Sequence, residues 1–345
     1  MGPVTPADLS RCVVRAVRCA VADGELAAGA AVPERVVVER TRPGGVGDYA
    51  TPVAFQVAKA ARCAPRDVAD VLARRLGAEP GIERVEVTGA GFLNFVLPAP
   101  SAAAVITDVI VRDIAIRDVR GGAAHVVPAD ESGLGLRERV VRRSVLRLLC
   151  VQGGVADGTL LDSPAGAPVA PGAPVAPGAP VAPVAKRDGD VVARYGADAA
   201  CWAMLAVPAR ETPSFSDALL HQGEANEFFR VRYAHARSRA LVRNAHQLGF
   251  HQEPGDVDDA PALLRLLADH PLVLEAAAHH RAPERLVRSL VELADALLDF
   301  QYRVLPQGDE KPSAAHRARL ALAEAAGTVL AGGLALLGMD APERL

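Results

Sequence analysis

A proline-rich repeat separates two regions of different character in this chain. The hexapeptide Gly-Ala-Pro-Val-Ala-Pro occurs three times, beginning at Gly166, Gly172 and Gly178. Proline at every third position removes backbone donors and fixes φ, which favours an extended segment of the polyproline type. We interpret residues 161–185 as a Pro/Ala/Gly linker that reaches at most about 65 Å, at roughly 3.1 Å per residue. The folded domains are therefore expected on either side of it.

Composition limits the class of protein. The chain has 345 residues, of which 50% are hydrophobic, enough for two or three domains with packed cores. Its five cysteines are far apart and form no C-x-x-C pair, which argues against a disulfide framework or a zinc site and fits a reducing cytoplasm. The amino terminus has no apolar signal core, and no apolar run reaches the roughly 18 residues that span a bilayer. We expect a soluble cytoplasmic protein without a membrane segment or a metal.

The first 100 residues alternate between helical and strand patterns, which predicts a small α+β domain over 1–100. Pro6 suits a first helical turn, and apolar residues then recur at helical spacing. A glycine turn at 89–91 joins two strand patterns. The predicted elements are a helix over 6–23, a strand over 36–40, helices over 51–62 and 65–76, and strands over 85–88 and 92–97.

From residue 194 onward the pattern is almost wholly helical. Leu286, Leu290, Leu293, Leu297 and Phe300 follow the 3–4 spacing of one buried helix face, as in a helix bundle. Prolines and a late glycine separate predicted helices over 217–247, 260–280, 283–304 and 313–337. The predicted fold class is therefore an α+β amino-terminal domain followed by a mainly α-helical bundle, multi-domain, with a Pro-rich linker between.

The segment 224–246 gathers arginines and aromatic residues in a chain of net charge -3. It contains Arg230, Arg232, Arg237, Arg239 and Arg243, with no acid after Glu227, interleaved with Phe228, Phe229 and Tyr233. Guanidinium groups bind phosphate oxygens and aromatic rings stack on unpaired bases, so the segment suits RNA. The alternative is an ordinary core helix with a solvated basic face.

The run Asn226 to Arg237 resembles the opening of the anticodon-binding helical domain of bacterial arginyl-tRNA synthetases, most specifically in Tyr-Ala-His-Ala-Arg at 233–237. The closing residues 337–345, Leu-Gly-Met-Asp-Ala-Pro-Glu-Arg-Leu, are similar to the family's last residues, which suggests that this end is complete. The resemblance implies that 186–345 is an anticodon-binding bundle of the DALR type. It makes Arg232, Tyr233, His235 and Arg237 candidates for RNA binding, with a buried structural histidine as the alternative for His235.

Two motifs resemble the amino-terminal domain of the same family, Gly-Asp-Tyr-Ala-Thr-Pro-Val-Ala at 47–54 and Gly-Phe-Leu-Asn-Phe at 91–95. In the family this domain contacts the D-loop of tRNA, so Phe92, Asn94 and Phe95 become candidates for nucleotide contact. The odd separation of the two phenylalanines places them on opposite faces of a strand, which favours exposure of one of them. Pro52 stands where the family has Asn.

The catalytic elements of the family are not intact between these parts. Residues 128–133 resemble the entry to the family's His-x-Gly-His element, but no histidine follows, and His125 lies upstream without a partner at the needed spacing. Residues 185–192 resemble the end of the Lys-Met-Ser-Lys-Ser element, with Ala185 in place of serine. We interpret 101–160 as a remnant of the catalytic region, with no catalytic residue and no cofactor. The arginines of its helix, at 137, 139, 142, 143 and 147, form either a basic face for RNA or a solvated face.

Taken together, these patterns predict a paralogue of arginyl-tRNA synthetase without a catalytic core. We expect a non-catalytic tRNA-binding protein, with tRNA-Arg as its partner through D-loop and anticodon modules. One alternative is an arginine–tRNA ligase that binds ATP, as in the family. The other is a protein-docking remnant without RNA binding, whose partner is a synthetase or another tRNA-dependent enzyme.

Overall fold

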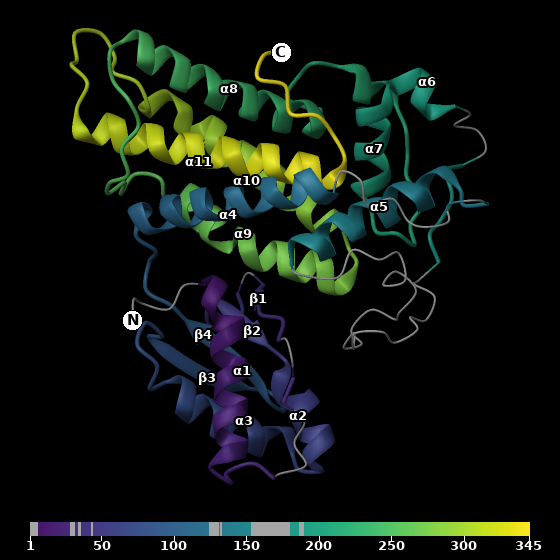
Figure 1. Cartoon of the computed structure of the whole chain (residues 1–345), viewed down its shortest axis with the longest axis vertical. Coiled ribbons are helices and arrows are strands. Elements are labelled where there is room, and N and C mark those ends of the chain that lie inside the picture. Colours follow the sequence, from purple (N-terminus) through teal and green to yellow (C-terminus); the bar gives the residue numbers. More distant parts are fainter. Residues whose placement is uncertain are drawn as a thin grey trace. The chain divides into compact units, whose positions relative to one another are not determined.

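The computed structural model describes residues 6–27, 32–33, 36–42, 44–123, 131, 133–152, 180–185 and 190–345 (Figure 1). Most of the predicted linker 161–185, His125 and most of the two degraded catalytic motifs lie outside these residues. The chain divides into two compact units. One comprises Met1–Pro100 and Pro271–Ala276, and the other comprises Ser101–His270 and Ala277–Leu345.

The first unit contains helices α1 (Pro6–Ala22), α2 (Val53–Ala61) and α3 (Pro65–Leu76) and a four-stranded antiparallel sheet. The strands are β1 (Glu39–Arg40), β2 (Tyr49–Thr51), β3 (Arg84–Thr88) and β4 (Phe92–Val96), in the order β1-β2-β4-β3. Phe95 of β4 pairs with Tyr49 on one side and with Val85 on the other. Because β4 is central, most of its side chains are buried, and those of Leu93 and Phe95 are fully enclosed in the core.

Local signals account for most of these elements. Helix α3 has Pro65 at its first position, Asp67 in its first turn, and Arg74 and Arg75 in its last turn, which matches both the φ restraint of proline and the helix dipole. The strand expected over 36–40 is shorter, because only Glu39 and Arg40 pair with β2. Strand β2 itself had no counterpart in the prediction.

The second unit is mainly helical. Its elements are α4 (Ala102–Ala123), α5 (Leu136–Val151), α6 (Val191–Tyr195), α7 (Ala197–Leu205), the short 3-10 helix η3 (Asp217–Leu220), α8 (Glu227–Gln247), α9 (Pro261–His280, apart from Pro271–Ala276), α10 (Glu284–Phe300), η4 (Gln301–Arg303) and α11 (Ala314–Leu337). Helix α11 packs against α4, α5, α8 and α10 and forms the centre of the bundle. The predicted fold class, an α+β region followed by a mainly helical region, is confirmed.

One helix boundary differs from the prediction. The helix expected over 217–247 begins at Glu227, because Asn226 caps it: its side chain accepts a hydrogen bond from Phe229 N at 3.2 Å. The same side chain donates to the carbonyls of Leu219 and His221 at 3.1 and 2.9 Å. These bonds turn the chain back toward η3 and separate the two helical segments.

Helix α11 also departs from the expectation that no segment is long and apolar enough to span a membrane. Its 24 residues pass that test by length and composition, since Glu324 is the only charged residue after Arg319. However, 78% of the apolar window is buried inside the protein. This burial is that of a core helix in a bundle.

Arg137 on α5 is a buried cation with a structural role. Its side chain is 1% exposed. Its Nε donates to Met204 O at 3.1 Å, and its two terminal nitrogens donate to the carbonyls of residues 182, 207, 208, 209 and 211. Burial lowers the pKa of this guanidinium. Arg137 therefore joins α5 to two stretches of main chain and does not belong to a surface for RNA.

The other arginines of α5 are also engaged within the protein. Arg143 pairs with Glu131, Arg142 pairs with Glu138 at 3.4 Å, and Arg139 donates to Leu134 O at 2.6 Å. Burial lowers the pKa of Arg147. These contacts leave little of the basic face that the sequence suggested.

Candidate nucleic-acid interface

Helix α8 carries the arginines that the sequence analysis singled out, and most of them hold other parts of the bundle. Arg230 forms an ion pair with Asp295 at 2.8 Å, and Arg237 Nε donates to Gln301 Oε1 at 2.5 Å. Arg239 lies 3.2 Å from the Glu343 carboxylate and Arg243 donates to Glu343 O at 3.4 Å. These four side chains connect α8 to α10, η4 and the carboxy-terminal segment.

Arg232 differs from the other arginines of this helix. No hydrogen-bond acceptor for Arg232 lies among the described residues, and its Nε is enclosed without a partner. The guanidinium lies over the Phe228 ring, 5.2 Å from the ring centroid. Arg232 is thus the α8 arginine whose guanidinium donates to no acceptor among the described residues.

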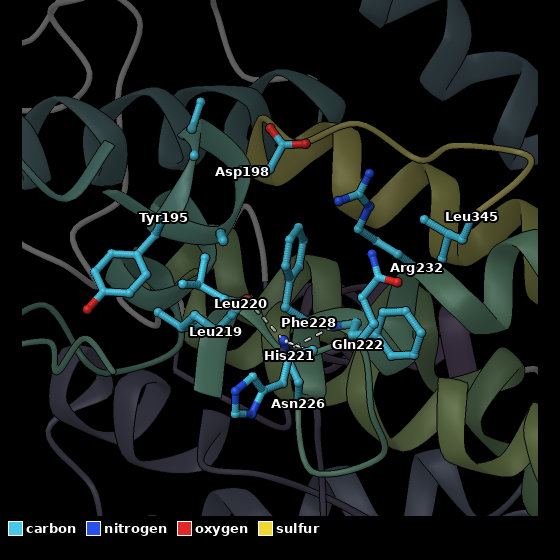
Figure 2. Close-up of a pocket in the computed structure, with 14 residues that line it drawn as sticks. Tyr195, Asp198, Leu219, Leu220, His221, Gln222, Asn226, Phe228, Arg232 and Leu345 are labelled. Atoms are coloured by element: carbon cyan, nitrogen blue, oxygen red, sulfur yellow. Dashed lines mark hydrogen bonds between the residues drawn. The ribbon is translucent and has the colours of Figure 1, made fainter. Parts of the chain in front are cut away.

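A pocket of about 500 Å³ lies between the first turns of α7 and α8 (Figure 2). We call it the α7–α8 pocket. Its lining consists of residues 195–199, residues 219–222, Asn226, Phe228, Phe229, Arg232 and Leu345. Asp198 on α7 and Arg232 on α8 are its two charged side chains.

Aromatic rings form a second feature of α8. Phe229 and Tyr233 lie one helical turn apart and stack, with centroids 5.8 Å apart and planes inclined by 15°. Tyr233 is 41% exposed, so a large part of its ring faces solvent. Solvent-facing aromatic rings are platforms on which unpaired bases stack. We call this pair the α8 aromatic platform.

His235 lies inside the bundle. Its side chain is buried, and its Nδ1 lies 3.0 Å from the carbonyl oxygen of Pro342. Burial lowers the pKa of the imidazole, an effect that the Pro342 carbonyl partly offsets. The structure therefore favours the structural histidine that the sequence left as the alternative.

In the first unit, the three candidates on β4 have different surroundings. Phe92 is 44% exposed and packs edge to face on Phe55, with centroids 5.0 Å apart. Phe95 is fully buried, as its position on the opposite strand face allows. Phe95 therefore cannot reach a nucleotide without unfolding of the core, and we do not retain it as a contact.

Asn94 is also largely buried. Its Nδ2 donates to Thr88 Oγ1 at 2.8 Å and to the carbonyls of Glu86 and Phe92 at 3.3 and 3.4 Å. The bonds to Thr88 and Phe92 fix the turn that presents the Phe92 ring. The structure thus gives Asn94 the role of a residue that positions Phe92.

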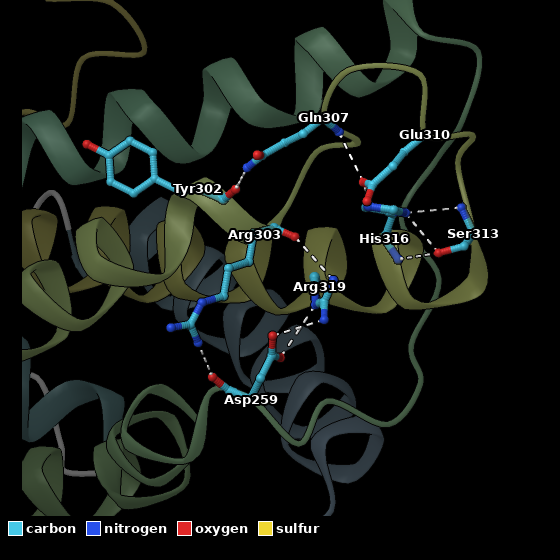
Figure 3. Close-up of polar contacts among 8 residues, drawn as sticks. All are labelled: Asp259, Tyr302, Arg303, Gln307, Glu310, Ser313, His316 and Arg319. Atoms are coloured by element: carbon cyan, nitrogen blue, oxygen red, sulfur yellow. Dashed lines mark hydrogen bonds and ion pairs between the residues drawn. The ribbon is translucent and has the colours of Figure 1, made fainter.

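Sequence reasoning did not identify Tyr302. It is 68% exposed. The preceding residue, Gln301, accepts a hydrogen bond from Arg237 in the middle of α8. A polar network fixes the main chain around it, in which Gln307 Nε2 donates to Tyr302 O at 2.6 Å (Figure 3). A signal was available, because Tyr302 comes two residues after Phe300 and therefore falls off the buried 3–4 stripe.

The same network joins three segments around Tyr302. Arg303 donates to Asp259 O at 2.7 Å, and Arg319 of α11 pairs with the Asp259 carboxylate at 3.0 Å. Ser313 and His316 form a capping box at the start of α11 (Figure 3). Among the residues that the structure describes, His, Cys, Asp and Glu side chains nowhere gather in threes as metal ligands.

Comparison with known proteins identifies both folded parts. The family model described as "Arginyl tRNA synthetase N terminal domain" matches residues 11–97, and the one described as "DALR anticodon binding domain" matches residues 231–345. The chain thus carries two domains of an aminoacyl-tRNA synthetase.

The relatives agree with these matches. An arginine–tRNA ligase of Frankia alni is 27% identical over 558 aligned positions, covering 99% of this chain and 100% of that protein. The alignment is much longer than the present chain, so the relative has segments that this chain lacks. The chain belongs to the arginyl-tRNA synthetase family, and it lacks the catalytic core region.

Two solved structures share the fold. Arginyl-tRNA synthetase of Thermus thermophilus aligns with a TM-score of 0.52 and 15% identity, over 98% of this chain and 100% of that one. Arginyl-tRNA synthetase of Plasmodium falciparum aligns with a TM-score of 0.51 and 10% identity, over 98% of each chain. Together with the DALR domain, this family membership supports a function related to tRNA.

Proposed function

We propose that this chain is a non-catalytic tRNA-binding protein of the cytoplasm, which recognises tRNA-Arg through a D-loop module and an anticodon module. The observation that carries the proposal is the α8 aromatic platform, whose Tyr233 ring faces solvent within the segment matched by the anticodon-binding domain. The proposed organisation keeps four parts, with boundaries at 1–100, 101–160, 161–185 and 186–345.

On the anticodon side, an unpaired base stacks on Tyr233. Arg237 lies one turn further along α8, where Gln301 orients its guanidinium, and Tyr302 follows Gln301 directly. Arg232 adds a cation next to Tyr233 in the sequence, on the pocket side. In this arrangement the rings supply stacking and the two arginines supply phosphate or base contacts.

On the D-loop side, Phe92 is the contact residue. Its ring is presented by a turn that Asn94 holds, and Phe55 supports it from the edge. Stacking on this ring accounts for an exposed phenylalanine at the end of a central strand.

The experiment compares two RNAs, full tRNA-Arg and its isolated anticodon stem-loop, at about physiological salt. Tyr233→Ala should weaken binding of both RNAs by about 5- to 150-fold, because stacking on one aromatic ring contributes about 1–3 kcal/mol per base. Phe92→Ala should weaken binding of the full tRNA alone, since the stem-loop has no D-loop. Equal effects of Phe92→Ala on both RNAs would contradict the assignment of the two modules.

The proposal also excludes aminoacyl transfer. The resemblance implies that activation of arginine with ATP needs two phosphate-binding elements, and the sequence has neither in intact form. We expect no arginine charging of tRNA above a protein-free blank in the presence of ATP. Charging that persists in purified protein and disappears with Tyr233→Ala would establish the alternative, an active arginine–tRNA ligase. Absence of any tRNA preference would instead favour a protein-docking role.

A further inference from the structure

We infer that the α7–α8 pocket binds one free amino acid, held as a zwitterion, whose side chain is apolar. The inference goes beyond the proposed function, because the ligand is a small molecule whose binding needs no RNA. Apart from Arg232 and Leu345, every residue of the pocket lining precedes the matched anticodon-binding domain. The walls of the pocket thus lie mostly outside the domain whose family implies RNA binding.

The pocket is large enough for a single amino acid. Its volume of about 500 Å³ falls within the usual range of pockets for small ligands. The ring of Phe228 forms one wall, and Leu219 and Leu220 add apolar surface. Phe228 packs on the buried Trp202, with ring centroids 5.4 Å apart, so this wall is held in place. A ligand with an apolar group can remove that group from water against these side chains.

Arg232 supplies the positive charge of the pocket. Its guanidinium donates to no acceptor among the described residues, and its Nε is enclosed. The guanidinium lies over the Phe228 ring, 5.2 Å from the centroid, and this contact restrains its position. A planar guanidinium binds a carboxylate through two parallel hydrogen bonds. Arg232 therefore suits a ligand that carries a carboxylate.

Asp198 supplies the negative charge. It stands in the first turn of α7, where the helix dipole favours a carboxylate. One of its oxygens accepts from Asp340 N at 3.3 Å, and the other oxygen keeps its acceptor capacity. In the view of Figure 2, Asp198 and Arg232 both lie above the Phe228 ring. The pocket thus offers a ligand an acceptor from α7 and donors from α8.

The two opposite charges select the chemical class of ligand. Asp198 and Arg232 line the same pocket but form no ion pair with each other in the described part of the chain. A phosphate would be attracted by Arg232 and repelled by Asp198, and a simple amine would meet the opposite conflict. A free amino acid carries a carboxylate and an ammonium group on one carbon atom. It is therefore matched to both side chains.

The remaining lining selects the side chain of that amino acid. Asp198 and Arg232 are the two charged side chains of the pocket, so a further charge on the ligand would be desolvated without a counter-charge. The apolar surface of Leu219, Leu220 and Phe228 instead favours a side chain such as that of leucine, methionine or phenylalanine.

The test is a ligand-observed NMR titration of the full chain, without RNA, with free L-phenylalanine and two blocked forms of it. N-acetyl-L-phenylalanine lacks the ammonium group and L-phenylalaninamide lacks the carboxylate, but both keep the ring. We expect L-phenylalanine to bind with a Kd on the order of 1 mM or tighter. Each blocked form, and likewise L-arginine and L-glutamate, should bind at least about 10-fold more weakly.

Two variants assign the charged contacts. With Arg232→Met, L-phenylalaninamide should bind no more weakly than L-phenylalanine, because the partner of the carboxylate is gone. Asp198→Asn has nearly the same shape and can still accept from Asp340 N, and it should remove the advantage of the free ammonium group. Arg265→Met is the matched control, since it removes an exposed arginine of α9 outside the pocket. This control should keep the full preference for L-phenylalanine.

The outcomes that would overturn the inference are distinct. If Arg232→Met does not fold, as judged by circular dichroism, Asp198→Asn decides. Equal binding of L-phenylalanine and its blocked forms to the unmodified protein would contradict the zwitterion, and strongest binding of a charged amino acid would contradict the apolar side chain. Absence of binding by leucine, methionine and phenylalanine up to about 10 mM would remove the site. The proposed function stands in each of these cases, because it is tested with RNA.

Discussion

Individual arginines of this protein either bond to other parts of the fold or leave their guanidinium without an acceptor, and composition does not distinguish the two. Arg137 is buried against main-chain carbonyls, and four arginines of α8 are held by side chains or main chain of other elements. Arg232 alone among the five of α8 has no hydrogen-bond acceptor within the part of the chain that the structure describes. These arginines differ in whether the fold places a hydrogen-bond acceptor next to the guanidinium.

Arg137 should be among the positions most sensitive to substitution. Arg137→Met removes the hydrogen bonds to six carbonyls and leaves several of them buried, so we expect the free energy of unfolding to fall by about 3 kcal/mol or more. Arg143→Met on the same helix breaks an exposed pair with Glu131 and should cost less than about 1 kcal/mol. Urea denaturation of both variants tests this, and equal losses would contradict the structural role of Arg137.

His235 should make stability depend on pH. Burial lowers its pKa in the folded state below the value near 6.5 of the unfolded chain. The unfolded chain therefore binds the proton first as pH falls, so stability decreases below about pH 6.5 and levels off below the folded pKa. A single such proton changes stability by at most about 1.4 kcal/mol per pH unit.

The measurement is denaturant unfolding between pH 8 and pH 5 for the unmodified protein and for His235→Asn. Asparagine can still donate to the Pro342 carbonyl but takes up no proton. The stability difference between the two proteins should shrink as pH falls from 7 to 5. A difference that is constant over this range would contradict the assignment.

The candidate residues illustrate what sequence alone could supply at this scale. The strand period separated Phe92 from Phe95, and the structure has one exposed and the other buried. The pairing of Arg230 with Asp295 or of Arg239 with Glu343 could not be anticipated, because the partners lie 65 and 104 residues away along the chain. No local pattern records contacts of that range.

At the scale of elements, helices α8 and α11 are in close contact at a small residue. Gly327 of α11 faces Ser238 of α8, whose Oγ donates to Ala323 O at 2.8 Å. A Cβ added at Gly327 would lie 2.7 Å from the Ser238 Cβ. The two backbones can approach this closely because residue 327 lacks a side chain.

Gly327→Ala should therefore destabilise the bundle, although alanine favours helix over glycine by about 1 kcal/mol. Overpacking of this kind costs about 1–3 kcal/mol. Combination with Ser238→Gly should recover part of the loss, so the double variant should be more stable than the sum of the single effects. Thermal or urea unfolding of the three variants measures this coupling, and strict additivity would count against close packing.

Helix and strand prediction succeeded where local signals are complete. Helix α3 occupies the predicted residues 65–76, since proline, charge and apolar period agree there. The predicted start of α8 was wrong, because Asn226 accepts from Phe229 N as the cap and donates to the carbonyls of Leu219 and His221, and apolar spacing cannot reveal these bonds. Strand β2 was missed because three residues are too few for a period and depend on pairing with β4.

At the scale of the whole molecule, charge sets an expectation for RNA binding. The chain has a formal net charge of -3, and four arginines of α5 and α8, Arg142, Arg143, Arg230 and Arg239, form ion pairs with carboxylates within the described residues. Binding should then depend more on stacking and base contacts than on phosphate contacts. Such a predominance of stacking and base contacts over phosphate contacts is unusual for a protein that binds RNA.

We expect the logarithm of tRNA affinity to fall with the logarithm of salt concentration with a slope no steeper than about -3, because each phosphate contact adds roughly 0.7–0.9 to its magnitude. Binding titrations at salt concentrations between about 50 and 300 mM, over which the Debye length shortens and screening increases, provide the slope. A slope of about -6 or steeper would mean that the arginines release their partners when RNA binds. The Arg243→Met variant should leave the slope nearly unchanged.

The contact between Trp202 and Phe228 has a practical consequence for spectroscopy. The chain contains one tryptophan, so its intrinsic emission comes from a single place. That indole is buried against the Phe228 ring, which lines the α7–α8 pocket, and does not itself line the pocket. Movement of the ring would change the surroundings of the indole, and the unlabelled protein thus carries its own fluorescent reporter at the α7–α8 junction.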